Sequence, residues 1–127
     1  MRRFATLPLF LLLVLSVGCS RVNYEDTLTV GAGDVKAKII TAKSEQKVTI
    51  TVTSTDAPVN VHVMLESEHK AAMDKLTNYQ KPDSAKLLAS KDGVREETFE
   101  VTVPRGEFAI VLSGAAKTTT VKVKAKG

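Results

Sequence analysis

Apolar and polar residues alternate strictly through much of this chain. Valines and an isoleucine alternate with threonines over residues 48–53, and valines alternate with more polar residues over 59–66. The same period of two returns over residues 98–103 and 121–126, and Phe108, Ile110 and Leu112 occupy alternate positions of a further run. Successive side chains of a strand point to opposite faces, so each alternating run has one apolar and one polar face. The pattern predicts half-buried antiparallel strands.

Weaker strand candidates cover residues 27–30, 35–41 and 86–90. Glycine, proline, aspartate and serine clusters predict the turns, which fall at residues 31–34, 44–46, 56–58, 91–93, 104–106 and 113–114. Seven or eight short strands at this spacing, with no alternation of strands and helices, predict an all-β fold. We expect a two-sheet antiparallel β-sandwich.

One segment, residues 67–77, departs from the strand pattern. It is rich in helix-forming residues, with Ser67 at the N-cap position, Glu68 in the first turn and Pro82 beyond its end. Spacings of three and four place His69, Ala72, Met73 and Leu76 on one face. We expect a short helix that closes one end of the sandwich.

Four stretches within residues 34–125 carry a family resemblance. They are the strand VTITVTS, the strand VNVHVMLES that follows it, and the closing FEVTVPRGEFAIVLSG and TTTVKVKAK. This layout resembles the small β-sandwich modules of the GOLD and bacterial pre-peptidase C-terminal families. In such modules a hairpin through Pro-x-Gly leads into the penultimate strand. Their members are mostly non-catalytic accessory or cargo-binding modules, so the resemblance implies a binding role.

The amino terminus has the pattern of a secretory signal segment. Arg2 and Arg3 precede an apolar run over residues 4–17. The run is shorter than the roughly 20 residues that a membrane-spanning helix needs, and it fits a cleaved signal peptide.

The end of this run, Leu-Ser-Val-Gly-Cys at residues 15–19, resembles the bacterial lipobox, with Ser16 where an aliphatic residue is more common. The resemblance implies cleavage before Cys19 and acylation of that cysteine, including a palmitate-type chain. The alternative is an ordinary secreted protein cut near Gly18. Cys19 is the sole cysteine, and an unpaired exposed thiol would be a liability in an exported protein. The lipoprotein is therefore the favoured interpretation.

Three segments follow from this interpretation: a signal peptide at 1–18, the lipidated cysteine and a short tether at 19–26, and one β-sandwich domain at 27–127. Ser20 is not the aspartate that often retains such proteins on the inner membrane. In a cell with two membranes we expect the outer one, with the domain facing the periplasm. The expected partners are the membrane, through the lipid on Cys19, and a protein or other envelope component.

Charge argues against nucleic acid as a partner. Signal cleavage removes Arg2 and Arg3, so the formal net charge of +4 falls by two, and the remaining lysines are interspersed with glutamates. The last strand carries outward lysines, and Lys117 precedes it. Such lysines could contact anionic headgroups or protect an edge strand from pairing with another molecule, and we favour edge protection.

Aromatic residues are scarce once the signal peptide is removed. Only Tyr24, Tyr79, Phe99 and Phe108 remain, and the pattern places both phenylalanines on inward faces. Carbohydrate and single-stranded nucleic-acid sites generally use exposed aromatic rings as stacking surfaces. The chain offers at most the two tyrosines for that purpose.

Candidate metal ligands are His62, Met64, His69 and Met73. His62 and Met64 point the same way from one strand, and His69 and Met73 lie four apart on the expected helix. Imidazole and thioether groups together are typical of copper carriers, because soft methionine sulfur selects Cu(I). In the alternative, His62 is a solvated strand residue and Met73 packs beneath the helix.

Catalytic patterns are missing. The two histidines have no serine or aspartate in a recognisable relation to them. Glu96 and Glu97 are adjacent and should point to opposite faces, and the glycines at 31 and 33 lack the third glycine of a dinucleotide loop. We therefore expect no enzyme and no cofactor. The leading hypothesis is a membrane-anchored envelope lipoprotein with a non-catalytic binding or accessory domain, and the alternative is a periplasmic copper-type metal-binding protein.

Overall fold

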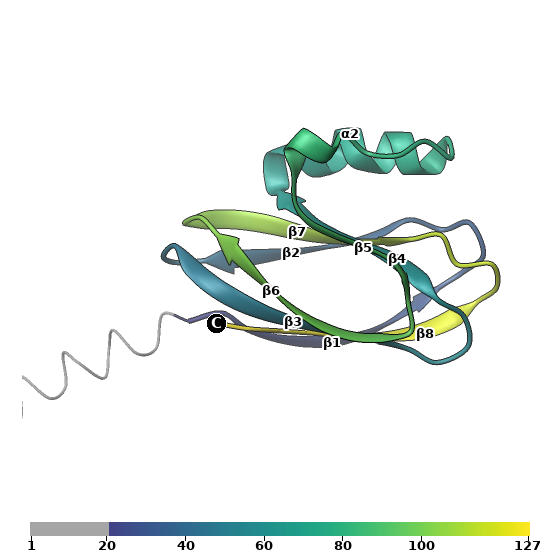
Figure 1. Cartoon of the computed structure of the whole chain (residues 1–127), viewed down its shortest axis with the longest axis horizontal. Coiled ribbons are helices and arrows are strands. Elements are labelled where there is room, and N and C mark those ends of the chain that lie inside the picture. Colours follow the sequence, from purple (N-terminus) through teal and green to yellow (C-terminus); the bar gives the residue numbers. More distant parts are fainter. Residues whose placement is uncertain (1–20) are drawn as a thin grey trace, which may run out of the picture.

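The structure, a computed structural model that describes residues 21–127, contains two antiparallel four-stranded sheets packed face to face (Figure 1). The signal segment and Cys19 lie outside the described residues. The first sheet has the order β1 (Asn23–Val30), β8 (Thr119–Lys126), β3 (Gln46–Ser54), β6 (Glu96–Val103). The second has the order β2 (Lys36–Ala42), β7 (Gly106–Ser113), β4 (Val59–Leu65), β5 (Leu87–Val94). The predicted two-sheet β-sandwich is confirmed.

The chain passes from one sheet to the other after almost every strand. Only β4 and β5 are consecutive and paired, and their connection holds helix α2 (Glu66–Thr77) and the short 3-10 helix η1 (Ser84–Lys86). This strand order is that of an eight-stranded jelly roll. The turn expected at residues 104–106 is present, but the hairpin that the family resemblance implies there is wrong. β6 pairs with β3 whereas β7 pairs with β2 and β4, because a turn signal marks where a strand ends and not which strand it pairs with.

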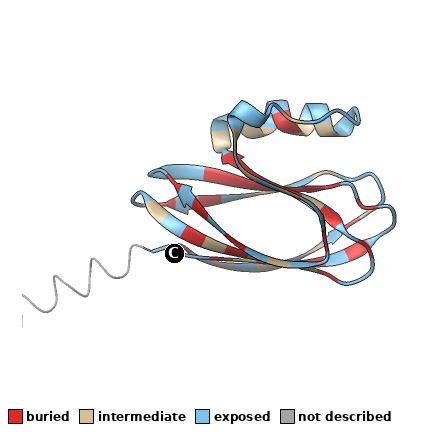
Figure 2. Ribbon diagram, viewed as in Figure 1, coloured by how far each residue is buried: buried red, intermediate tan, exposed pale blue. Residues whose placement is uncertain are grey.

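The core lies between the sheets and consists mainly of valines and isoleucines (Figure 2). Its largest fully buried side chains include Phe108, Ile50, Ile110 and Leu112. These residues come from the alternating runs of the sequence, which confirms the inward faces predicted for them. Burying each such side chain contributes about 1.5–3 kcal/mol, so this interior is the main source of stability.

Strand β1 begins earlier than the sequence indicates. We expected a tether up to residue 26, but Val22 is buried and β1 starts at Asn23. The start of this strand is hard to recognise in the sequence because charged side chains occupy its outward-facing positions. Glu25 Oε1 lies 3.4 Å from Lys122 Nζ and 3.3 Å from Lys124 Nζ of the neighbouring strand.

The lysine-rich strand is not an edge. β8 lies between β1 and β3, so the expected role of its lysines in edge protection is wrong. A central strand of an antiparallel sheet still has one solvated face, and lysines satisfy that face as well as they would an edge. Here Lys122 and Lys124 face the carboxylate of Glu25.

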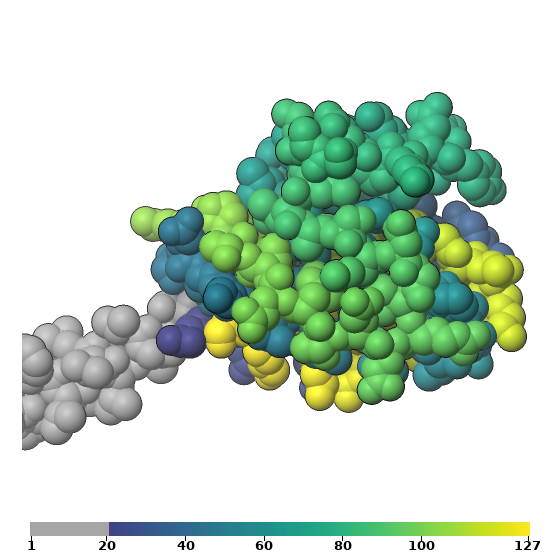
Figure 3. Space-filling model, in the orientation of Figure 1, coloured from purple at the N-terminus to yellow at the C-terminus, as the bar shows by residue number. Residues whose placement is uncertain are grey.

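Helix α2 lies across the outer face of the second sheet and not at one end of the sandwich (Figure 1). Met64, Ala109 and Val111 make that face apolar and pack with Ala72 of the helix, with Met73 and Leu76 at the margin. The helix begins at Glu66 after Leu65, so Ser67 is not its N-cap. In the space-filling view α2 forms a ridge on top of the sandwich (Figure 3). No helix in the described part of the chain is long and apolar enough to cross a membrane.

The turn expected at residues 91–93 lies within β5, which continues to Val94. Gly93 has a φ of 63° and accommodates the irregular pairing of β4 with β5 near this end. The chain bends at Arg95 and enters β6 in the other sheet.

We expect the core between the sheets to dominate stability. Ile50→Ala should lower the free energy of unfolding by about 2–5 kcal/mol, because Ile50 is fully buried. Ile39→Ala is the matched control, since Ile39 is 39% exposed on the outer face, and it should cost less than about half as much. Urea denaturation measures both. Equal losses would contradict this assignment of the core.

Candidate functional site

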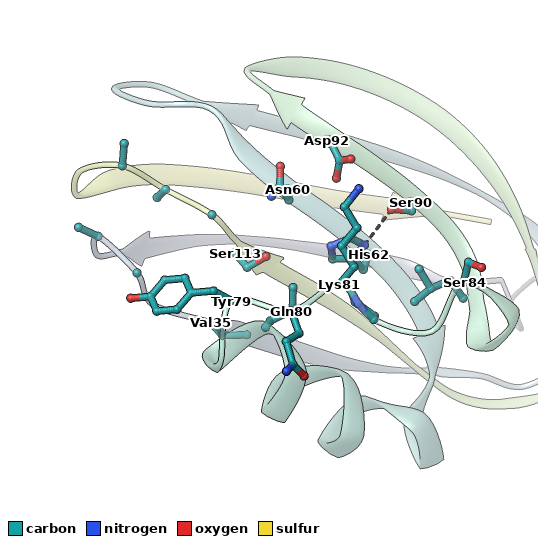
Figure 4. A pocket seen from close by; sticks show the side chains of 18 residues that line it. Val35, Asn60, His62, Tyr79, Gln80, Lys81, Ser84, Ser90, Asp92 and Ser113 are labelled. Carbon is teal, nitrogen blue, oxygen red and sulfur yellow. Dashed lines mark hydrogen bonds between the residues drawn. The ribbon is translucent and has the colours of Figure 1, made fainter.

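A pocket of about 870 Å³ opens beside α2 over the outer face of the second sheet (Figure 4). Its floor comes from β4, β5 and β7. Its walls are the segment that follows α2, the β1–β2 loop and the β7–β8 loop. A volume of this size is within the usual range for small-molecule sites, roughly 300–1,000 Å³.

The alternation of β4 produces this floor. Val59, Val61 and Val63 point into the core between the sheets, so the residues between them point to the outer face. On that face Met64 lies beneath α2, whereas Asn60 and His62 line the pocket. The outer face is thus apolar where the helix covers it and polar beside the helix.

His62 is buried in the pocket floor and is not the solvated residue considered as an alternative above. It is 5% exposed, and its Nδ1 lies 2.8 Å from the Ser90 hydroxyl oxygen on the neighbouring strand. Burial lowers the pKa of His62, and the negative charge of Asp92 opposes this shift only in part. The imidazole is therefore neutral at pH 7.

Asn60 and Ser113 occupy paired positions on β4 and β7. The Asn60 side-chain carbonyl accepts a hydrogen bond from the Gly93 amide at 3.0 Å. Ser113 is 3% exposed and its hydroxyl has no hydrogen-bond partner within residues 21–127. Gly114 follows with a φ of 76°, and a Cβ there would lie 2.5 Å from Asn60 Nδ2, so only glycine fits beside Asn60.

Tyr79 lies at the rim in an unusual backbone conformation. The Tyr79 amide donates to the Leu76 carbonyl at 3.1 Å and the Gln80 amide to the Lys75 carbonyl at 2.8 Å. These two bonds form a Schellman motif at the end of α2, with Tyr79 at the position that usually holds glycine. Its φ of 58° costs about 1–2 kcal/mol for a residue with a side chain. The side chain is 91% exposed.

The pocket lining contains one positive and one negative side chain. Lys81 and Asp92 line it, and Figure 4 shows the Lys81 side chain extending toward Asp92. The remaining polar side chains in the lining are uncharged amides, hydroxyls and the neutral His62. Hydrogen bonding to an uncharged ligand is the chemistry that this set offers.

The predicted metal ligands lie in different environments. His62 lines the pocket, whereas Met64 and Met73 belong to the apolar cluster beneath α2. His69 Nδ1 lies 2.6 Å from the Glu66 carbonyl oxygen of its own helix. Within the part of the chain that the structure describes, no three His, Cys, Asp or Glu side chains are placed to hold a metal ion. Metal binding by the four residues stays a prediction.

Sequence reasoning found His62 but missed Ser113, Ser90 and Asn60 as its neighbours in the pocket. The alternation could have placed Asn60 beside His62, because both occupy even positions of one strand. Nothing in the sequence indicates that β7 pairs with β4, so no sequence pattern predicts that Ser113 lies in the pocket. Tyr79 was counted only as an available aromatic residue.

Comparison with known proteins supports the architecture. No family model matches the sequence, and a search of curated proteins finds no match. Among solved structures, the pre-peptidase C-terminal domain of a Bacillus anthracis collagenase aligns with a TM-score of 0.60 and 12% identity, over 83% of this chain and 90% of that one. The Yersinia pseudotuberculosis-derived mitogen aligns with a TM-score of 0.53 and 9% identity, over 83% and 85%. At such identities these likenesses show the fold alone, a β-sandwich of the kind that the sequence resemblance to pre-peptidase C-terminal domains implies.

Proposed function

We propose that this protein is a lipid-anchored envelope protein whose β-sandwich is a non-catalytic binding domain, with the pocket beside α2 as its ligand site. The anchor is the lipid on Cys19, and the outer membrane, with the domain in the periplasm, is the proposed location. The size of the pocket and the polar groups that converge on its floor support a small ligand.

The buried hydroxyl of Ser113 carries the proposal. A buried polar group without a partner costs about 1–3 kcal/mol, and native proteins retain few of them. Ser113 lines the pocket, so a bound ligand could supply the missing hydrogen bond. A domain that served only as a spacer would have no use for this group.

The position of the pocket fits an anchored binding domain. β1 begins close to the proposed anchor and runs to Val30, and the loop after it lines the pocket. The pocket therefore extends over the outer face of the second sheet as far as the end of the sandwich where β1 finishes, which is opposite to the start of that strand. An eight-residue strand spans roughly 26 Å, which would hold the pocket away from the membrane surface.

The Ser90 and His62 pair is the feature nearest to catalysis. A serine within hydrogen-bond reach of a histidine is the start of a nucleophilic site. Among the described residues, however, the ring bonds only with Ser90, and no carboxylate orients its other nitrogen. His62 and Ser90 are directly paired residues of the neighbouring strands β4 and β5, so their hydrogen bond also has a structural explanation as a cross-strand contact. We therefore favour binding over catalysis.

Cys19→Ala should release the protein from the membrane fraction. Acyl chains contribute about 0.8 kcal/mol per buried methylene, so their loss removes the anchor. Cell fractionation with immunoblotting measures the distribution, and Ser20→Ala, which leaves the cysteine in place, is the control. Retention of the Cys19→Ala protein in membranes would overturn the anchor.

Ser113→Ala should raise the free energy of unfolding by about 1 kcal/mol, because it removes a buried group that has no partner. Ser54→Ala is the matched control. The Ser54 hydroxyl is also buried, but it donates to the Ala57 carbonyl and bonds with Thr119 Oγ1 at 2.8 Å, so its removal should cost about 1–2 kcal/mol. Urea denaturation distinguishes the two. A loss at Ser113 similar to that at Ser54 would show that the Ser113 hydroxyl is structural.

Stability should fall as the pH drops below about 6.5, the ordinary pKa of histidine. The pKa of His62 is lower in the folded state, so the unfolded chain takes up the proton first. The contribution is complete above the unfolded pKa, and the loss levels off below the folded pKa. Denaturation curves between pH 5 and 8 should show this slope for the unchanged protein and a smaller slope for His62→Gln. Equal slopes in both proteins would refute a buried neutral His62.

A further inference from the structure

We propose that the ligand of this pocket is a neutral sugar, stacked on the ring of Tyr79 and hydrogen-bonded to the uncharged polar groups of the floor. The inference rests on the proposed binding function and names the chemical class of its ligand. Three observations carry it: the backbone of Tyr79, the exposure of its ring, and the composition of the floor.

The backbone of Tyr79 shows that an aromatic residue is held where glycine would fold more easily. The Schellman motif at the end of α2 needs a left-handed residue, and Tyr79 adopts a φ of 58° to satisfy it. Strained residues of this kind concentrate at ligand sites, and they persist only where the surrounding structure holds them. The side chain of Tyr79 is therefore the reason to look for a ligand here.

The ring of Tyr79 is available for stacking. It is 91% exposed, and it lines the pocket together with Val35 and Gly33 of the β1–β2 loop (Figure 4). A Cβ on Gly33 would lie 3.8 Å from the Tyr79 hydroxyl, so the ring reaches close to that loop. The other tyrosine of the domain, Tyr24, is half-buried and its hydroxyl lies 3.4 Å from Asp26. Of the two tyrosines that the sequence offers as stacking surfaces, Tyr79 is therefore the one available at the pocket.

The floor suits a molecule with many hydroxyl groups. Asn60 has an amide, His62 is neutral, and Ser90 and Ser113 have hydroxyls, so the floor offers both donors and acceptors. A sugar has the same mixture of donors and acceptors on its rim and an apolar face for an aromatic ring. One of its hydroxyls could pair with Ser113, whose oxygen has no protein partner in residues 21–127.

Other ligand classes fit less well. A phosphate or carboxylate group would find one positive side chain in the lining, that of Lys81. The Lys81 side chain extends toward the carboxylate of Asp92, which would repel an anion (Figure 4). An acyl chain would bury the polar groups of Asn60, His62 and Ser113 without hydrogen bonds, which is costly. A planar aromatic ligand could stack on Tyr79 but would leave most of the floor unpaired.

The test uses the full chain, purified in a detergent without a sugar headgroup. Neutral tetrasaccharides of glucose, galactose, mannose and N-acetylglucosamine are titrated in turn while amide NMR signals are followed. We expect at least one to shift the amides of Asn60, His62 and Ser113. Tyr79→Gly should then weaken that sugar about five- to tenfold and raise the melting temperature by about 4 °C, because it removes the ring and the backbone strain together.

Control variants separate the ring from the backbone. Tyr79→Phe keeps both the ring and the strain, so affinity should stay within about twofold and the melting temperature should not change. Tyr79→Asn tolerates the left-handed conformation without a ring, so it should lose affinity as Tyr79→Gly does. Undiminished binding by Tyr79→Gly would overturn the role of the ring.

Two negative results have different meanings. If no tetrasaccharide shifts these amides but inorganic phosphate, acetate or indole does, the sugar class is wrong and the pocket is still a ligand site. If none of these probes shifts the pocket amides, both the sugar inference and the proposed function of the pocket fail.

Discussion

The burial of β4 on both of its faces is the constraint on which the rest of the structure depends. Its odd-numbered valines complete the core between the sheets, so its even-numbered residues must face outward. Met64 on that outer face is apolar and needs a cover, which α2 provides. The helix covers only part of the face, and the polar residues Asn60 and His62 fall in the part beside it. One alternating strand thus positions the helix and the pocket together.

Two local costs occur together at this pocket. The hydroxyl of Ser113 is buried without a partner among the described residues, and Tyr79 holds a left-handed backbone conformation. The core between the sheets compensates for both, because its fully buried isoleucines, valines and Phe108 contribute far more than either cost. Departures from locally optimal choices that coincide at one cavity are the pattern expected of a binding site.

The sequence predicts the layers of this fold well and its connections poorly. Alternation identifies the faces of β3, β6 and β8 because burial on one face imposes a period of two, and in β4 it identifies the valines that face the core. It does not identify partners, which is why the lysines of β8 suggested an edge strand and residues 104–106 suggested a hairpin. β1 was partly missed because Glu25 is balanced by lysines of a strand almost a hundred residues away in the chain. The pocket is missed for the same reason, because Ser113 comes to lie beside Asn60 only through the pairing of β7 with β4.

The proposed anchor and the pocket constrain each other. Because β1 starts at Asn23, only residues 20–22 separate it from Cys19, and even fully extended they reach roughly 10 Å. A lipid on Cys19 would hold the start of β1 close to the bilayer and direct the opposite end of the sandwich, with its pocket, away from the membrane. A ligand would then arrive from the aqueous side and not from the lipid phase. This geometry agrees with the floor of the pocket, whose uncharged hydrogen-bonding groups suit a water-soluble molecule better than an acyl chain.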